Sequence, residues 1–367
     1  MSDKSKRTMK VSSVPIKRDT RHRFEQWAKN PSCEANTVSA VHNMPMYEVA
    51  KKESPSAKNM RKASPFALAR GVTFERMLFD KSAKMIVEHL NKVNLLDVES
   101  PNTFIDLRTK MNGGSIENLD IAVNKFTELL QHLTAYSDSD QLIVAAATMK
   151  LVGNYMIPET ILVVDALVCK RVGDRWELTV GEVKTYPDRG GFTDKSHLSS
   201  TRAQAGVYVY ALDRTINELG LGSKMAVAEN GFIVLTRPGT IFPRIRYPED
   251  LKYQSDRAKR GFKDLMAVAE NLKRARDDKK AAYIESAGTC YGQGCISFCE
   301  RANICYEREF KNGNPVVLGD DVEEFARGIN LKRINKIVKG QVSRTALDDN
   351  EKSFLDDYKG MLSLLED

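Results

Sequence analysis

The residues from 160 to 184 show the pattern of two adjacent β-strands. Thr160 to Lys170 is an apolar and β-branched run, which is typical of a strand. Arg171 to Asp174 contains a glycine and charged residues, as a hairpin turn does. Trp176 to Lys184 then alternates apolar and polar positions, the pattern of a half-buried strand. The sequence therefore predicts a β-hairpin here.

Charged residues occupy the middle of this predicted hairpin. Residues two apart in a strand share a face, so Glu182 and Lys184 point the same way and Val183 points to the opposite face. An antiparallel partner strand brings Asp165 onto the face of Glu182. A charge inside an apolar strand needs a partner or a metal, so the pattern favours a functional site.

Two carboxylates beside a lysine suit metal-dependent hydrolysis. Carboxylates in a cleft bind Mg²⁺ or Mn²⁺, which prefer hard oxygen ligands. Such a metal polarises a phosphodiester and lowers the pKa of a bound water, and the lysine orients that water and offsets charge. The acid-x-Lys spacing alone is weak, because it recurs at Asp250 to Lys252 and Asp278 to Lys280 in predicted helices.

Helical periodicity flanks the hairpin on both sides. Thr201 to Tyr210 is predicted to be helical, which places Gln204 and Tyr208 one turn apart on one face. Phe66 to Leu90 carries a broad apolar stripe and is predicted to be one helix, with Glu75 facing inward near its start.

The rest of the chain alternates between helical and strand patterns. Arg244 and Arg246 share a face of a second predicted hairpin. The pattern as a whole indicates an α/β fold with a mixed β-sheet flanked by helices. The other predicted elements are a strand or short helix at 103–108, helical or mixed segments at 115–135 and 140–151 forming a helical insertion over about 93–155, a hairpin at 230–247, and a basic helix at 248–280.

Composition narrows the class of protein. The 367 residues include 42% hydrophobic ones, which is the content of a globular protein. No apolar run approaches the length of a membrane span, and the basic, polar N-terminus lacks the apolar core of a secretory signal. We therefore expect a cytoplasmic or other intracellular protein, neither secreted nor bound to a membrane. The net charge of +7 permits binding of nucleic acid without requiring it.

Four of the six cysteines fall within a short segment. Cys290, Cys295, Cys299 and Cys305 surround two glycines, which let a backbone wrap closely around a metal centre. Thiolates suit zinc or an iron–sulfur cluster, and thiolate chemistry alone does not separate the two. The spacing differs from the paired Cys-x2-Cys of common zinc modules, so zinc is not favoured. Cys169 lies on a predicted strand and is expected in the core.

The order of these motifs resembles that of the RecB-like nucleases of the PD-(D/E)XK superfamily, over roughly residues 24 to 310. The resemblance implies a restriction-endonuclease-like core that cleaves DNA. There are two departures from the family pattern. Glu75 stands where many relatives have a histidine, which leaves the metal preference open, and the proline and aspartate that name the superfamily are not adjacent. The matching motifs are Gly71-x-x-x-Glu75, Asp165, Gly181-Glu-Val-Lys184 and Gln204-x-x-x-Tyr208.

The resemblance also implies a role for each residue of these motifs. Glu75, Asp165 and Glu182 would bind the metal, Lys184 would serve the attacking water, and the glutamine and tyrosine would line the DNA side of the site. The implied catalytic residues are Asp165, Glu182, Lys184, Gln204 and Tyr208.

A subset of these nucleases carries a [4Fe–4S] cluster, bound by one early cysteine and three that follow the nuclease core. The resemblance therefore favours Cys33, Cys295, Cys299 and Cys305 as ligands, although the first interval of the late trio is one residue longer than usual. Cys290 is the rival fourth ligand. Such a cluster would join the N-terminal and C-terminal parts of the core, with zinc as the alternative metal.

Basic residues near the predicted site are candidates for contact with DNA. Pro187 to His197 has the turn chemistry of an exposed loop and follows the hairpin directly, so it borders the site. Arg189 and Lys195 in this loop, and Arg202 in the next helix, are the candidate phosphate ligands.

Three regions follow from these patterns. Residues 1–23 are basic and poor in apolar residues, which indicates a disordered arm. Residues 24–310 form the nuclease domain, and residues 311–367 form a helical extension that docks a protein partner or packs on the core. The expected function is that of a metal-dependent nuclease, an exonuclease acting on single-stranded or frayed DNA ends. The alternative is a non-catalytic nucleic-acid-binding or assembly subunit with a degenerate nuclease fold.

Overall fold

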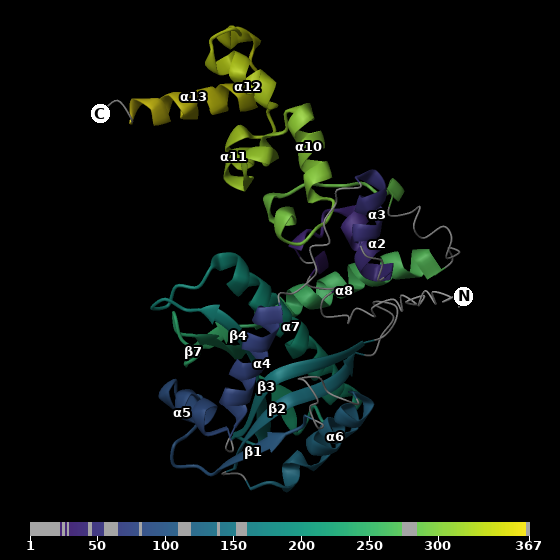
Figure 1. The fold of residues 1–367 in the computed structure, drawn as a ribbon, viewed down its shortest axis with the longest axis vertical. Helices are drawn as coiled ribbons and strands as arrows, with labels where there is room; N and C mark the ends of the chain where they lie inside the picture. Colours follow the sequence, from purple (N-terminus) through teal and green to yellow (C-terminus); the bar gives the residue numbers. More distant parts are fainter. Residues whose placement is uncertain are drawn as a thin grey trace, which may run out of the picture.

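The computed structural model describes residues 23, 26–27, 29–42, 46–54, 65–80, 83–108, 119–137, 140–151, 160–273 and 285–364. These residues form a mixed β-sheet with helices on both faces, and a group of short helices beyond it (Figure 1). The prediction of an α/β fold with a mixed sheet flanked by helices is confirmed. The expectation of a disordered arm falls on residues 1–22, which lie outside the described residues, and on Arg23, which is buried.

The strands are β1 (Asn102–Asp106), β2 (Gln141–Leu151), β3 (Thr160–Val172), β4 (Arg175–Pro187), β5 (Met225–Val227), β6 (Asn230–Thr236) and β7 (Pro243–Asp250). They lie in the order β1-β2-β3-β4-β6-β7, and β5 pairs with the first residues of β4. The pairs β2–β3, β3–β4 and β6–β7 are antiparallel, whereas β1–β2 and β4–β6 are parallel. The sheet therefore has an antiparallel centre, and a crossover connects β4 to β6.

Helices cover the sheet in two layers. On one face lie α4 (Pro65–Phe79) and α5 (Lys84–Lys92). On the other face lie α6 (Leu119–His132) and α7 (Lys195–Glu218), and α8 (Lys252–Lys273) packs on α7. Two N-terminal helices, α2 (Glu34–His42) and α3 (Met46–Glu53), join the same side as α8 (Figure 1).

Each face of the sheet has its own apolar core. Leu178 and Val180 on β4 pack with α7 residues such as Leu212 in the larger core. Val183 belongs to the other core, which includes Phe74 of α4. Neighbouring positions of β4 thus face opposite layers, as the alternating sequence predicts.

Two glycines bring elements into close contact around the later part of β4. A Cβ atom on Gly181 would lie 2.1 Å from the ring of Phe232 on β6, so only glycine fits between these strands. A Cβ atom on Gly206 of α7 would lie 2.5 Å from the Cβ of Gln254 on α8. The first contact fixes β6 against the strand that carries Glu182, and the second fixes α7 against α8.

The structure corrects two sequence-based expectations. The predicted helix from Phe66 to Leu90 is two helices, α4 and α5, and Ala83 before α5 adopts a left-handed φ of 59°. The predicted helical insertion over 93–155 contains β1 and β2, and β2 is a buried central strand. The alanines of β2 favour helix in isolation, but a strand buried on both faces also shows a continuous apolar run.

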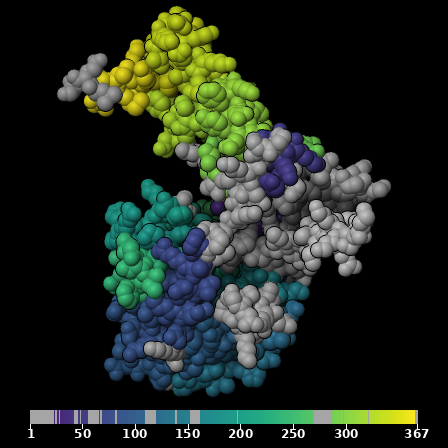
Figure 2. Space-filling view, in the orientation of Figure 1, coloured from purple at the N-terminus to yellow at the C-terminus, as the bar shows by residue number. Residues whose placement is uncertain are grey.

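The C-terminal residues form a separate group of helices. They include α10 (Ala302–Asn312), α11 (Asp320–Ala326), α12 (Leu331–Val338) and α13 (Asp349–Ser363). Ile337 and Phe354 lie in a small core of their own, and Figure 2 shows this group projecting from the body. Within the described residues, no helix is long and apolar enough to span a bilayer. Short 3₁₀ helices lie at Leu133–Ala135, Gln293–Ser297, Pro315–Leu318 and Arg344–Ala346.

Candidate active site and cysteine cavity

The predicted hairpin forms as expected and brings Asp165 next to Glu182. The register pairs Ala166 with Gly181, so Asp165 and Glu182 occupy the next positions of the two antiparallel strands. The Asp165 carboxylate accepts a hydrogen bond of 2.9 Å from the backbone N–H of Val183. Its oxygen atoms therefore lie beside the peptide that follows Glu182.

A polar network lies between β4 and α7 inside the larger core. Glu182 is fully buried, and its Oε1 atom lies 2.5 Å from the Nζ atom of Lys184. Gln204 donates a hydrogen bond from Nε2 to the same carboxylate oxygen and accepts one of 3.0 Å from Lys184. It also donates to the hydroxyl of Tyr208, at 2.9 Å. The structure thus brings together Glu182, Lys184, Gln204 and Tyr208, as the sequence predicts.

This network contains charged side chains but lies almost entirely inside the protein. Glu182 and Tyr208 are 0% exposed, whereas the side chain of Lys184 keeps 23% of its surface exposed. A buried carboxylate is costly unless it is paired and hydrogen-bonded, and the Oε1 atom of Glu182 meets both conditions through Lys184 and Gln204. The lysine is the member of the network that reaches towards solvent.

Glu75 is the third carboxylate that the sequence assigned to metal. It lies half-buried on α4, on the opposite side of the sheet from α7. Among the described residues, which include Glu75, Asp165 and Glu182, no three His, Cys, Asp or Glu side chains are grouped to hold a metal ion. The donor chemistry of Asp165 and Glu182 fits a hard cation such as Mg²⁺ or Mn²⁺. Glu75 is not grouped with them here.

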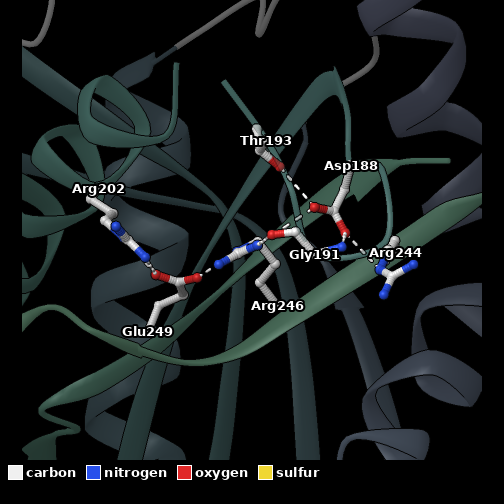
Figure 3. A network of polar contacts seen from close by, with 7 residues as sticks. All are labelled: Asp188, Gly191, Thr193, Arg202, Arg244, Arg246 and Glu249. Atoms are coloured by element: carbon white, nitrogen blue, oxygen red, sulfur yellow. Dashed lines mark hydrogen bonds and ion pairs between the residues drawn. The ribbon is translucent and has the colours of Figure 1, made fainter. Parts of the chain in front are cut away.

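A second network fixes the loop that follows β4 (Figure 3). Asp188 is fully buried and lies 2.6 Å from Arg244 and 3.5 Å from Arg246, both on β7. It also accepts a hydrogen bond of 2.9 Å from Thr193. The sequence indicated that the two arginines share a face. It did not identify Asp188 as their partner, because Asp188 lies 56 residues before Arg244 and 58 before Arg246 in the chain.

The network continues from Arg246 to α7. Glu249 accepts hydrogen bonds from Arg246 Nε at 2.8 Å and from Arg202 Nε at 2.6 Å (Figure 3). Arg202, which the sequence made a candidate DNA ligand, is therefore engaged by a buried carboxylate. Its contact holds the start of α7 against β7 and so supports the helix that carries Gln204.

The other candidate DNA ligands lie on the surface beside these networks. Arg189 and Lys195 are exposed, at the loop after β4 and at the first residue of α7. Close to them in the chain, His197 stacks on Tyr186 with ring centroids 4.2 Å apart. Tyr186 lies two residues beyond Lys184, so this aromatic pair adjoins the row of charged residues on β4.

Five cysteines line one cavity on the far side of α8. Cys33 reaches it from the turn before α2, and the other four come from the segment before α10 and from α10 itself. The free volume among them is about 10 Å³, which is enough for about one water molecule. The cysteines of the cavity are Cys33, Cys290, Cys295, Cys299 and Cys305, and Cys169 lies in the sheet as expected.

Contacts across some 250 residues hold this cavity together. Asn30 donates from Nδ2 to the carbonyl of Cys290 at 2.9 Å and contacts the sulfur of Cys295 at 3.2 Å. Arg301, 9% exposed, pairs with Glu53 of α3 at 2.5 Å. These contacts join Asn30 and α3 to the segment that carries the late cysteines.

Burial favours the neutral form of several of these thiols. It raises the pKa of Cys299 to about 12, and it raises the pKa of Cys290 and Cys305 in the same direction. At Cys305, Arg301 and Arg308 partly oppose the effect of burial on the pKa. A bound metal would displace these protons, because the thiolate is the form that binds.

Comparisons with known proteins leave the function to be argued from these sites. No family model matches the chain, and neither a curated protein nor a solved structure matches it.

Proposed function

We propose that the chain is a metal-dependent nuclease that hydrolyses phosphodiester bonds in DNA, with the active site on β4. The observation that carries the proposal is the buried Glu182, which is paired with Lys184 and lies one strand away from Asp165. A salt bridge that served stability alone would be equally stable as an apolar pair, so burial of these charges favours a chemical role.

The order of elements around the site supports the same proposal. A helix precedes three antiparallel strands, and a crossover helix then leads to a strand parallel to β4. This order packs the helix α7 against the strand that carries Glu182 and Lys184. The acidic and basic residues lie on β3 and β4, and Gln204 and Tyr208 lie on the crossover helix α7.

Each residue of the site has a role in this proposal. Asp165 and Glu182 supply hard oxygen ligands, and Lys184 orients the attacking water and offsets charge in the transition state. Gln204 holds both the carboxylate and the ammonium in place through hydrogen bonds. When bound, Mg²⁺ or Mn²⁺ supplies polarisation of the phosphodiester and a water of lowered pKa.

The test of the active site compares two lysine variants. In Lys184→Ala, cleavage of labelled single-stranded DNA is expected to fall at least about 100-fold, because the transition-state charge loses its counter-ion. Lys263→Ala removes an exposed lysine of α8 and should cleave like wild type. Both variants should bind the same DNA. Equal cleavage by Lys184→Ala and Lys263→Ala would refute the assignment of the site.

We further propose that the cysteine cavity holds a [4Fe–4S] cluster with a structural role. Cys33, Cys295 and Cys305 are buried and Cys299 is half-buried, whereas Cys290 is exposed. Four thiolates are the ligand set of such a cluster, and the four less exposed cysteines match it. A cluster there would tie the residues around Cys33 to α10 and stabilise the closure of a very long loop.

Metal content and cysteine variants test this second proposal. Anaerobically purified protein should contain about four irons and four sulfides per chain. Cys33→Ser should lose most of the iron, and Cys290→Ser should retain it. Cys169→Ala, which alters a cysteine in the sheet, is the matched control for loss of a thiol. Zinc in place of iron would refute the iron–sulfur cluster and leave the proposed nuclease activity unaffected. Loss of iron in Cys290→Ser but not in Cys33→Ser would show that Cys290, and not Cys33, is the fourth ligand.

A further inference from the structure

The arginines at one end of the sheet fall into two groups. Arg202, Arg244 and Arg246 are each paired with Asp188 or Glu249. Arg70, Arg189 and Arg237 lie in the same region, and among the described residues none of the three is within salt-bridge distance of a carboxylate. Arginines left without an acidic partner in a region where carboxylates neutralise others are suited to bind an external anion.

Two of these arginines line the same pocket. The pocket has a volume of about 650 Å³, and its wall includes Arg70 of α4, Arg189 of the loop after β4, and the β6–β7 turn from Pro238 to Phe242. The described residues that line it include no acidic residue. Its volume lies within the range of small-ligand sites, which is large enough for a nucleotide.

The pocket adjoins the proposed active site through the backbone of β4. Pro187 of its wall lies three residues beyond Lys184. Arg70 contacts the hydroxyl of Thr236 at 3.5 Å, and that hydroxyl donates to the carbonyl of Tyr186 at 3.2 Å. The pocket and Lys184, the member of the proposed active site that reaches solvent, therefore share the later part of β4.

Exposed phenylalanines accompany the unpaired arginines. Phe242 lines the pocket and is 57% exposed. Phe66 lies one turn before Arg70 on α4 and is 87% exposed, and Phe192, which bridges to Arg189, is 82% exposed. Arginine and aromatic residues side by side form the pattern that binds single-stranded nucleic acid, through phosphate contacts and base stacking.

We propose that this pocket binds a single-stranded segment of the substrate next to the bond that is cleaved. The proposal deepens the proposed nuclease function and rests on it for the identity of the substrate. Arg70 and Arg189 contact phosphates, and Phe242 stacks on an unpaired base. A base in a duplex already stacks on its neighbours, so the phenylalanine discriminates in favour of single strands and frayed ends.

The test measures binding in a chain that does not cleave. Full-length Lys184→Ala serves as the host, and the probe is a fluorescein-labelled oligothymidylate of about fifteen nucleotides, followed by anisotropy at several salt concentrations. Arg70→Ala and Arg189→Ala should each weaken binding and reduce the magnitude of the salt slope by about 0.7 for each phosphate that is no longer neutralised. Arg175→Ala at the β3–β4 turn removes the same charge from the opposite end of β4 and is the matched control.

The stacking contact has its own variants. Phe242→Ala should weaken binding by about fivefold or more, and Phe242→Trp should restore it. A blunt duplex of equal length should show a smaller effect of Phe242→Ala. A 5-iododeoxyuridine probe should crosslink to the peptide that contains Phe242, which gives a readout that does not depend on any substitution.

The outcomes separate the pocket from the nuclease. If the Arg70→Ala and Arg189→Ala variants bind as tightly as Arg175→Ala does, and the crosslinks lie elsewhere, the proposal that this pocket binds single-stranded DNA is overturned. That result would hold even if the wild-type chain cleaves DNA. Binding that depends on the pocket, in a wild-type chain that never cleaves, would keep the pocket and refute the nuclease.

Discussion

The two groups of arginines at the end of the sheet differ in whether a carboxylate neutralises their charge. Arg244 and Arg246 meet the buried Asp188, and they fix the loop after β4 against β7. Arg70 and Arg189 meet no carboxylate among the described residues and border a pocket. The same residue type thus holds the fold where acids neutralise it, and it is available to an anion where they do not. Position near the site alone does not assign an arginine to DNA, as Arg202 shows.

The largest expected effect on stability comes from removing the negative charge of Asp188, the carboxylate that pairs with Arg244 and Arg246. Asp188→Asn leaves Arg244 and Arg246 without this negative partner and should lower the free energy of unfolding by about 3 kcal/mol, the low end for a broken buried pair, because the arginines are partly exposed. Urea unfolding checks this value. Unchanged stability would show that the network does not hold the loop, and the distinction between the two groups would fail.

Glu249→Gln should have a smaller effect. The glutamine can still accept a hydrogen bond, so only the charge opposite Arg202 and Arg246 is removed, and the expected decrease in the free energy of unfolding is about 1–2 kcal/mol. Cleavage should also fall, because Arg202 holds the start of α7 and hence Gln204. Urea unfolding and a cleavage assay measure the two effects. A variant that lost stability and kept full cleavage at low temperature would show that this end of α7 does not position the site.

The smallest effect on stability is expected from the unpaired group. Arg237→Ala should change the free energy of unfolding by less than about 0.5 kcal/mol, because it breaks no ion pair among the described residues. Binding of single-stranded DNA should weaken modestly, with a smaller salt dependence. If Arg237→Ala destabilises the chain as much as Asp188→Asn does, the two groups do not differ as described.

Local patterns were sufficient to predict the hairpin and the helix that carry the candidate site. Strand alternation placed Glu182 and Lys184 on one face, and helical spacing placed Gln204 and Tyr208 together; the structure confirms both arrangements. The periods of strand and helix set the directions of these side chains, so nearby sequence carries the information. Five cysteines line one cavity, but among the described residues no three of them are grouped to hold a metal ion, so the predicted cluster stays a prediction.

Long-range partners could not be predicted in the same way. The partners of Asp188 lie on β7, and the partner of Arg202 lies 47 residues away, so their pairing depends on the completed sheet. The prediction for β2 was wrong because alanine-rich, fully buried strands resemble helices in sequence. Helix α4 ends at Phe79 and α5 begins at Lys84, and Ala83 just before α5 adopts a left-handed φ that no residue preference indicates.

We propose that Asp165 on β3 and Glu182 on β4 hold the metal with which the chain cleaves DNA. The most direct measurement is cleavage of labelled single-stranded DNA by anaerobically purified full-length protein in Mn²⁺, beside Asp165→Asn and Glu182→Gln. We predict cleavage by wild type that EDTA abolishes, and a decrease of at least about 100-fold in each variant. Cleavage by Glu182→Gln at the wild-type rate, or intact DNA after incubation with folded wild-type protein, would contradict the account.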